Sequence, residues 1–293
     1  MLKPNNFGYN FETKSTNSFQ NKTKESKIII KEKAIEEFNS MVETLKNNKI
    51  NIEVFNDKVE KLPDSVFMNN WISTFPDGKL IIYPIFSEIR RKEKRVDLVN
   101  KIVEKYNISE FIDLSYFESK EHYLEGTGSV VFDYDNKIAY ACLSERTNET
   151  VFNELCRLIG YQGFVFNAEN LDGKSIYHTN VMMSITKHFA IVCLESINDP
   201  LDRSMIKLSL EQSGKKIIEI NFDQLNKFSG NSLEVFNQDN ESLFILSSTA
   251  ESSLSTEQKM KISEQSRIVT VNIPLIEKIG GGSARCMMTS LNC

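Results

Sequence analysis

The sequence predicts an α/β protein, a five-bladed α/β-propeller of ββαβ repeats in one domain over residues 1–293. The first observation is a recurring pattern of two short apolar runs, a helix and a third apolar run. The second is its period: the hairpins begin near residues 69, 129, 181, 232 and 284, at steps of 60, 52, 51 and 52 residues. Near-constant periods of this size are typical of propellers and arrays.

Four hairpins are complete in the sequence. Pro76-Asp77-Gly78 and Asp135-Asn136 favour tight reversals between apolar runs. The predicted hairpins are 69–75 with 79–85, 129–133 with 137–143, 181–186 with 188–194, and 233–236 with 242–246. A fifth run, 284–291, lacks a following partner, and we expect the N-terminal run 1–4 to supply it. A ring closed in this way buries the edges that an open sheet would expose.

Helices are predicted between the hairpins and the third strands, and Asn148, Asp199 and Ser255 are suitable capping residues. The predicted helices are 87–106, 147–160, 199–213 and 255–266, and the third strands are 111–114, 164–166, 216–220 and 268–271. Before the repeats, the sequence predicts a loop over 10–27, an amphipathic helix over 31–46 and a short strand over 51–55.

The composition excludes several functional classes. The 293 residues are 40% hydrophobic and 26% charged, as in ordinary globular proteins. A net charge of −5 gives no basic footprint for nucleic acid, and no apolar run approaches the roughly 18 residues of a membrane span. Five scattered cysteines argue against a disulfide framework or a zinc ribbon, and the polar N-terminus is unlike a signal peptide. We expect a cytoplasmic protein that binds neither nucleic acid nor a membrane.

Three residues with reactive side chains occupy equivalent positions in the repeat. Glu125, His178 and Cys286 each come at or just before the start of a hairpin. Because equivalent positions lie close together around the axis of a ring, these three side chains should converge on one cavity. Glycines nearby in the sequence permit close approach of the backbone to a ligand; they are at 126, 128 and 280–282.

These residue types suit covalent catalysis. A cysteine thiolate is a strong nucleophile, and a histidine protonates a leaving amine and later activates water. A carboxylate fixes the histidine tautomer and supports the imidazolium. The sequence therefore predicts Cys286 as the nucleophile, His178 as the acid/base and Glu125 as the carboxylate partner of His178.

The motifs around these residues carry a family resemblance. They read Leu124-Glu-Gly-Thr-Gly-Ser, Tyr177-His-Thr-Asn-Val and Gly280-Gly-Gly-Ser-Ala-Arg-Cys286. They resemble motifs of the arginine deiminase, dimethylargininase and amidinotransferase superfamily, whose members modify guanidines. Further segments resemble its citrulline utilisation hydrolase subgroup, and together they extend the resemblance over essentially the whole chain: Pro4-Asn-Asn-Phe-Gly-Tyr-Asn, Asn70-Trp-Ile-Ser and Ala139-Tyr-Ala-Cys-Leu-Ser.

The resemblance implies the pentein fold and a reaction that needs no cofactor or metal. Cys286 would attack the guanidinium or ureido carbon of an arginine- or citrulline-type amino acid, an amine would leave through His178, and water would hydrolyse the covalent intermediate. Two alternatives stay open. One is an amidinotransferase that passes the amidino group to a second amine, and the other is a binding protein that has lost catalysis. A homodimer is also left open.

The substrate-binding positions depart from the deiminase pattern. Deiminases hold the cationic guanidinium with carboxylates at the positions that align with Asn70 and Asn180. An amide offers no charge to a buried cation, so we expect a neutral ureido substrate, or a guanidine paired with a carboxylate elsewhere. Arg90 and Arg285 are candidates to bind the substrate α-carboxylate, although Arg90 could instead belong to a solvated helix face.

Overall fold

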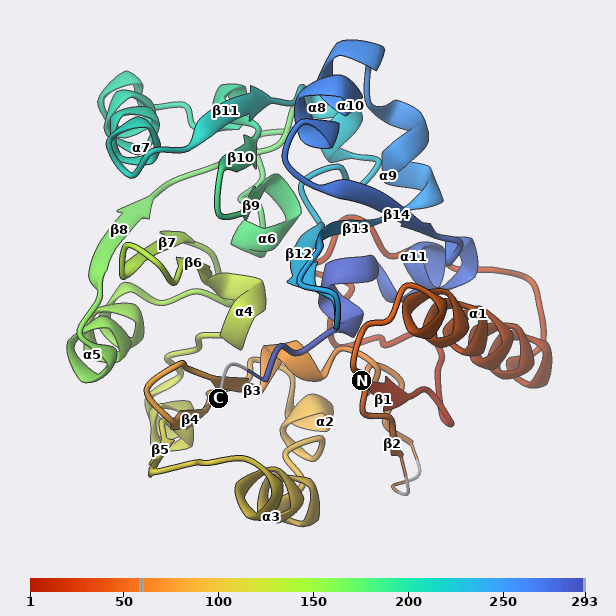
Figure 1. The fold of residues 1–293 in the computed structure, drawn as a ribbon. Helices are drawn as coiled ribbons and strands as arrows, with labels where there is room; N and C mark the ends of the chain where they lie inside the picture. The colour runs from red at the N-terminus through yellow and green to blue at the C-terminus, as the bar shows by residue number, and fades with distance from the viewer. Residues whose placement is uncertain (58, 60, 292–293) are drawn as a thin grey trace.

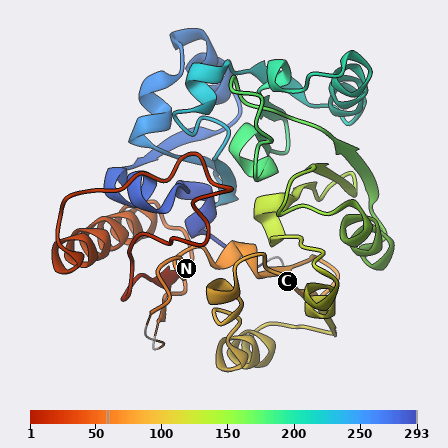
Figure 2. The same cartoon turned by 180° about the vertical axis from the view of Figure 1, so that it is seen from behind.

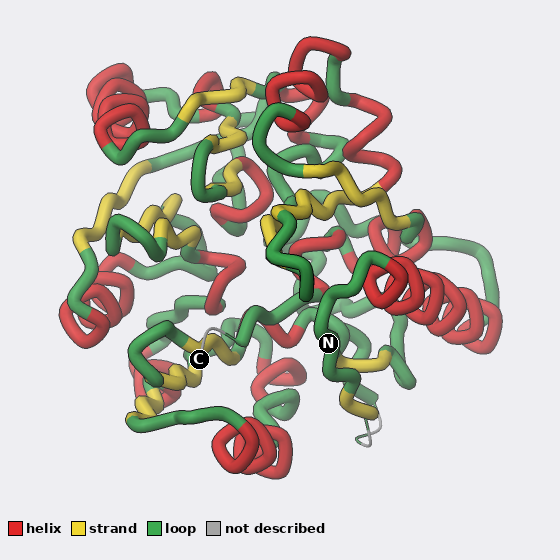
Figure 3. Tube along the Cα trace, viewed as in Figure 1, coloured by secondary structure: helices red, strands yellow, loops and turns green. Residues whose placement is uncertain are grey.

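The computed structural model describes residues 1–291 except 58 and 60. The chain forms a mixed α/β fold of small sheets arranged around a centre, with longer helices on the outside (Figure 1). Among the described residues, four sheets have three strands and one has two. Figure 3 shows that the strands lie inside the ring of helices α1, α3, α5, α7 and α10.

The three-stranded sheets share one topology, in which an antiparallel hairpin is followed by a helix and a parallel third strand. In the first sheet, Ile72 pairs with Ile82 across the hairpin, and Ile82 pairs with Asp113 of the third strand. The predicted hairpins and third strands of four repeats are thereby confirmed. The sheets comprise β3 (Ile72–Thr74), β4 (Lys79–Ile82) and β5 (Glu110–Asp113); β6 (Val131–Asp133), β7 (Ile138–Cys142) and β8 (Gln162–Phe166); β9 (Met183–Ile185), β10 (Phe189–Val192) and β11 (Lys216–Glu219); and β12 (Leu233–Phe236), β13 (Ser242–Ser247) and β14 (Arg267–Val271).

The connecting helices begin at the predicted caps. The side chains of Asn148, Asp199 and Ser255 each accept a hydrogen bond from a backbone N–H in the first turn. The predicted helix 87–106 is interrupted, because Arg95 is extended at the start of its second part. The helices outside the centre are α1 (Lys27–Asn47), α2 (Glu88–Arg91), α3 (Val96–Lys105), η2 (Ser115–Lys120), α5 (Glu149–Ile159), η3 (Leu194–Ser196), α7 (Pro200–Gln212), α8 (Phe222–Leu225), α9 (Ser248–Ser253), α10 (Thr256–Ser263) and α11 (Pro274–Gly280).

The fifth sheet differs from the prediction. The N-terminal strand β1 (Leu2–Lys3) pairs in parallel with β2 (Phe55–Asn56), not with 284–291. The predicted strand over 284–291 is wrong, because Ala284–Met287 forms a 3₁₀ helix, η4. The backbone N–H of Cys286 donates to the carbonyl of Ser283, which turns the chain away from an extended path.

Short helical turns lie at the centre. Three of them, η1 (Met68–Asn70), α4 (Gly126–Ser129) and α6 (Thr179–Met182), precede the first strands of their sheets, and the fourth is η4. The turn α4 packs against η1 and α6, and η1 packs against η4. Four residues are too few to give a helical period, so the sequence did not indicate these turns. They bring the motif positions of different repeats together.

The apolar side chains bury between the sheets and the outer helices. The buried face of α1, for example, includes Phe38 and Met41, which join the cluster around β13 and β14. None of the helices in the described part of the chain has both the length and the apolar composition of a membrane span.

Candidate active site

Glu125, His178 and Cys286 converge at the centre of the ring, as the repeat predicts. Glu125 and His178 are the residues at the N-terminal ends of α4 and α6, and Cys286 lies in η4. The Nε2 atom of His178 lies 2.8 Å from Oε2 of Glu125. His178 and Cys286 line one cavity of about 20 Å³. That volume accommodates about one water molecule.

Glu125 is completely buried and has two arginines close to it. Its Oε2 lies 3.5 Å from Nη1 of Arg146 and 3.8 Å from Nη1 of Arg90. Burial alone would raise the pKa of Glu125, but Arg146, His178 and Arg90 together hold it well below its usual range. Glu125 is therefore an anion that can support an imidazolium on His178.

His178 is neutral near pH 7. Burial lowers its pKa to about 4, although the hydrogen bond to Glu125 acts in the opposite direction. Nε2 contacts Glu125, so Nδ1 is the ring nitrogen left for proton transfer. An added Cβ at Gly128 would lie 2.7 Å from this Nδ1 and 2.4 Å from Nδ2 of Asn70. The glycine therefore makes room for the histidine ring.

Two amides point at the nucleophile. The Nδ2 atoms of Asn231 and Asn180 lie 3.2 Å and 3.5 Å from Cys286 Sγ. Amide N–H groups at this distance offer partial positive charge to the sulfur. Asn231 also donates to the backbone carbonyl of Asn180, which orients the Asn231 amide. Asn231 was missed by sequence reasoning, although it directly precedes the fourth hairpin, where the other repeats carry their motif residues.

The other described cysteines lie in the core. Burial raises the pKa values of Cys142, Cys156 and Cys193 to about 12, so these thiols stay protonated. Cys293 is outside the described residues. The environment of Cys286 differs because polar amides surround it and because it lines a cavity shared with a histidine.

Arg90 lines the Cys286 cavity and is buried, so the solvated-face alternative is wrong. Its guanidinium makes a pair of hydrogen bonds with the carboxylate of Glu93, with Nη2 at 3.0 Å from Oε2. Its Nη1 donates to Oδ1 of Asn70 at 2.9 Å. Arg90 thus holds the Asn70 side chain in place at the edge of the cavity.

Asp64 is a cavity residue that sequence reasoning missed. Its Oδ2 accepts a hydrogen bond from Nδ2 of Asn10 at 2.8 Å, whereas its Oδ1 is buried without a hydrogen-bond partner. Burial raises the pKa of Asp64, partly offset by Arg90 at 3.9 Å. Asp64 follows a proline in a loop, so its sequence context is that of an ordinary turn residue.

The buried charges around the cavity do not balance. Two arginines, Arg90 and Arg146, face three carboxylates, Asp64, Glu93 and Glu125. When all five are ionised and His178 is neutral, one negative charge is left over. A buried uncompensated charge is unfavourable, so this site either holds a proton or gains a cation from its ligand.

The segment 10–20 forms the roof of the cavity. Thr13 and Asn17 line it, and Figure 2 shows this segment crossing in front of the centre. Arg146 connects the roof to the site: its Nη2 donates to the carbonyl of Thr13 at 3.0 Å, and its guanidinium stacks 5.0 Å above the ring of Tyr177. Arg146 was not identified from the sequence, because its contacts come from distant segments, and Tyr177 entered only as the first residue of the His178 motif.

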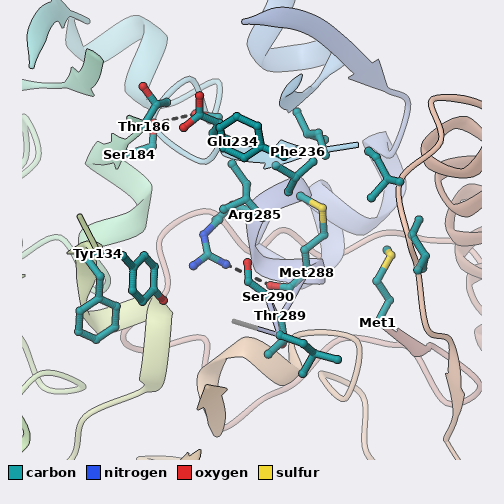
Figure 4. A pocket seen from close by; sticks show the side chains of 18 of the residues that line it. Met1, Tyr134, Ser184, Thr186, Glu234, Phe236, Arg285, Met288, Thr289 and Ser290 are labelled. Carbon is teal, nitrogen blue, oxygen red and sulfur yellow. Dashed lines mark hydrogen bonds between the residues drawn. The ribbon is translucent and has the colours of Figure 1, made fainter. Parts of the chain in front are cut away.

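Arg285 does not lie at the cavity of Cys286 and His178. Its side chain lies in a second cavity of about 1060 Å³, which Asn180 also lines and which Figure 4 shows. Among the residues that the structure describes, no group of three or more histidine, cysteine, aspartate or glutamate side chains is placed to hold a metal ion.

This site, carried by a ring of small sheets, defines a protein of the pentein superfamily, which contains amidinotransferases and arginine deiminases. The chain belongs to the family described as N,N dimethylarginine dimethylhydrolase, eukaryotic, whose model matches residues 3–292. A comparison with curated proteins gives no match. The narrower resemblance to citrulline utilisation hydrolases stays a prediction.

Solved structures share the fold. One is the N-terminal domain of ArgZ, an arginine dihydrolase from cyanobacteria, solved as a cysteine-to-serine mutant bound to substrate. It is 14% identical in sequence to this chain, with a TM-score of 0.75, and the match covers 98% of this chain and 95% of that chain. Unliganded AgrE has 16% identity and a TM-score of 0.76, with coverage of 98% and 38%. A dimethylarginine dimethylaminohydrolase adduct has 17% identity and a TM-score of 0.64, with coverage of 98% and 96%. This chain spans 39% of the full-length ArgZ chain.

Proposed function

We propose that this protein is a hydrolase that cleaves a C–N bond of a guanidino amino acid of the arginine type, through a covalent intermediate on Cys286. The observation that carries the proposal is Asp64. Its partnerless oxygen lies buried at the cavity that Cys286 and His178 line. A guanidinium is planar, cationic and rich in N–H donors, so it would satisfy this oxygen and neutralise the remaining negative charge.

The proposal prefers a guanidinium over the ureido group expected from the two amides. The Asn70 oxygen is used by Arg90, and the Asn180 amide contacts the thiol. Asn70 and Asn180 therefore do not have to take the place of the carboxylates that bind the guanidinium in deiminases, because Asp64 supplies a carboxylate. The printed names of the similar structures, arginine dihydrolase and dimethylarginine dimethylaminohydrolase, agree with a guanidino substrate.

The reaction would use the neutral histidine. On substrate binding, His178 takes the proton of Cys286, and the resulting imidazolium is supported by Glu125. The thiolate attacks the guanidinium carbon, the C–N bond breaks, and His178 returns the proton to the leaving amine. Water then attacks the thiouronium carbon and gives its proton to His178. The C–S bond breaks and the ureido product loses its remaining hydroxyl proton to solvent. His178 returns its proton to the sulfur, which restores the Cys286 thiol and the neutral histidine.

The remaining parts of the proposal concern the scaffold and the acceptor. We propose one domain with five propeller units, of which the fifth is reduced to β1 and β2. An amidinotransferase would form the same covalent intermediate, so water and a second amine are alternative acceptors.

A substrate panel tests the proposal. Purified protein is incubated separately with arginine, mono- and dimethylated arginines, agmatine and citrulline, with and without added glycine, and products are identified by mass spectrometry. We expect turnover of at least one guanidino compound, with release of its amine and no amidino transfer to glycine. Citrulline as the final product indicates one round of hydrolysis, and ornithine indicates two. Turnover of citrulline with none of the guanidines would contradict the proposal.

Acid quenching of the reaction should reveal the covalent intermediate as a mass increase on the peptide that contains Cys286. Cys286→Ser should lose this adduct and turnover. Cys193→Ala is the matched control, because Cys193 is also buried but lies in the core. Turnover that survives in Cys286→Ser would refute nucleophilic catalysis by this residue.

A further inference from the structure

A second cavity lies on the other side of the nucleophile. We propose that this cavity, of about 1060 Å³, is a second ligand site that takes a small organic carboxylate with an apolar body, and that Arg285 binds the carboxylate. Figure 4 shows the Arg285 side chain extending into the cavity between Tyr134 and Ser290. Ligand sites of this size are common in proteins.

Arg285 is a cation with no acidic partner among the residues that the structure describes. Its Nη1 donates to the carbonyl of Met288 at 3.1 Å. Burial lowers the pKa of Arg285, while Tyr134 and Cys286 act in the opposite direction. The guanidinium carries five N–H donors, so most of its hydrogen-bonding capacity is open to a ligand.

The described residues that line the cavity do not supply a counter-ion for Arg285. Of the acidic residues that line the cavity, Glu53 pairs with Lys105 and Asp133 pairs with Lys215. Glu234 accepts hydrogen bonds from the backbone N–H of Lys187 and the hydroxyl of Ser242. Asp135 is exposed at the rim of the cavity. An anionic ligand would therefore supply the counter-ion that Arg285 lacks among the described residues. A carboxylate suits this role because its two oxygens can accept two parallel N–H donors of the planar guanidinium.

The walls of the cavity indicate the rest of the ligand. They combine apolar groups from Phe132, Phe236 and Met288 with the hydroxyls of Ser184 and Thr186. Phe236 is 49% exposed, so its ring is accessible to a ligand in the cavity. A molecule with one carboxylate and an aromatic or aliphatic body would contact both kinds of surface.

The second cavity is separate from the catalytic one but adjacent to it. Asn180 lines the large cavity, and its Nδ2 lies 3.5 Å from Cys286 Sγ. Arg285 directly precedes Cys286 in η4. The catalytic cavity is lined instead by Asp64, His178 and Cys286. A ligand on Arg285 would thus lie behind the nucleophile and outside the space where His178 acts.

Calorimetry with matched probes tests the proposal. The probe is 3-phenylpropionate, and its neutral amide, 3-phenylpropionamide, has the same body without the charge. We expect wild-type protein to bind the acid at least about tenfold more tightly than the amide, because a charge-assisted pair with Arg285 is lost in the amide. Arg285→Gln should abolish this preference, and Arg285→Lys should retain part of it. Equal binding of acid and amide, or no binding of either at millimolar concentration, would overturn the proposal.

Two further variants locate the bound probe. Phe236→Ala should weaken binding of both probes, whereas Phe111→Ala should not, since Phe111 is a similarly exposed phenylalanine in β5, away from the cavity lining. Asp64→Asn, which alters the catalytic cavity, should bind the acid as the wild type does. A large effect of Asp64→Asn would place the acid in the wrong cavity and overturn the proposal. Since the experiment measures binding, its result does not depend on hydrolase activity.

Discussion

The Nε2 atom of His178 and the Oε2 atom of Glu125 lie 2.8 Å apart, and both side chains are buried at the centre of the ring. The carboxylate fixes the orientation of the imidazole and favours its protonated form. Glu125→Gln keeps the shape but removes the charge. We expect kcat to fall by about 10²–10⁴-fold while the protein remains folded.

The pH profile distinguishes this positioning role from a structural one. Glu125 raises the pKa of His178. In Glu125→Gln, the part of the pH profile of kcat/KM in which His178 becomes protonated should therefore move to lower pH. Glu154→Gln, which removes a half-buried surface carboxylate paired with Arg157, is the control and should leave the profile in place. An unchanged profile in Glu125→Gln would argue against the role.

Asp64→Asn should lower activity and raise stability. The Asp64 pKa is raised by burial, so the folded protein binds this proton more tightly than the unfolded chain does. Ionised Asp64 therefore costs stability above its ordinary pKa, and the cost disappears at lower pH. We therefore expect Asp64→Asn to raise Tm near pH 7, by about 2–4 °C for each kcal/mol by which the free energy of unfolding increases. Near pH 3 the substitution should leave Tm unchanged. Guanidine turnover should fall at least about 10²-fold. A destabilised variant at pH 7 would contradict the charge imbalance.

Gly128→Ala should impair catalysis through His178. The new Cβ would meet Nδ1 of His178 at 2.7 Å and Nδ2 of Asn70 at 2.4 Å, so the imidazole must shift. Displacement of a catalytic group by about 1 Å can reduce the rate by about 10²-fold. Gly8→Ala is the control, because nothing lies within 4 Å of a Cβ at that position. Steady-state kcat measured beside Tm checks the prediction, and wild-type kcat in Gly128→Ala would contradict it.

Arg146→Lys should loosen segment 10–20. A lysine ammonium cannot reproduce the separate contacts of the Arg146 guanidinium with Glu125, the Thr13 carbonyl and the Tyr177 ring. Hydrogen exchange of backbone amides in 10–20 should become faster, and KM should rise because the roof closes less well over the substrate. Arg157→Lys, at an exposed ion pair, should change neither quantity. Unaltered exchange in Arg146→Lys would exclude this coupling.

Acid sensitivity should depend on His178. Its folded-state pKa of about 4 lies below the ordinary 6.5, so the unfolded chain binds more protons between these values. Stability is therefore lost as pH falls from 6.5 towards 4, by roughly 3 kcal/mol for this group. His178→Gln should show a shallower decline of unfolding free energy over this window, measured by denaturant titration. His188→Gln, at an exposed histidine, should decline as the wild type does.

Local features of the sequence predicted most of the fold. The four hairpins follow from apolar runs joined by turn residues, and the helix starts follow from Asn148, Asp199 and Ser255. The fifth unit was mispredicted because an apolar run does not distinguish a strand from the tight turn of η4. The convergence of the three motif residues could be predicted because the repeat period relates distant positions.

The rest of the site depends on contacts that no local pattern contains. Asp64 is notable only for an oxygen left without a partner, and that depends on how Asn10 and Arg90 pack around it. Arg146 is held by a segment more than a hundred residues earlier in the chain. Asn231 is the exception, because the period alone would have placed it beside the nucleophile.

Hydrogen-bonded strand ladders stay within each sheet, and no ladder in the described part of the chain joins one three-stranded sheet to the next. The catalytic groups, however, come from different repeats, so their spacing rests on side-chain packing between the central turns. On heating, a slight loosening between repeats would separate the groups before any ladder breaks. Thermal inactivation should then precede the loss of circular dichroism, and a mild denaturant should abolish turnover while the secondary structure is still intact.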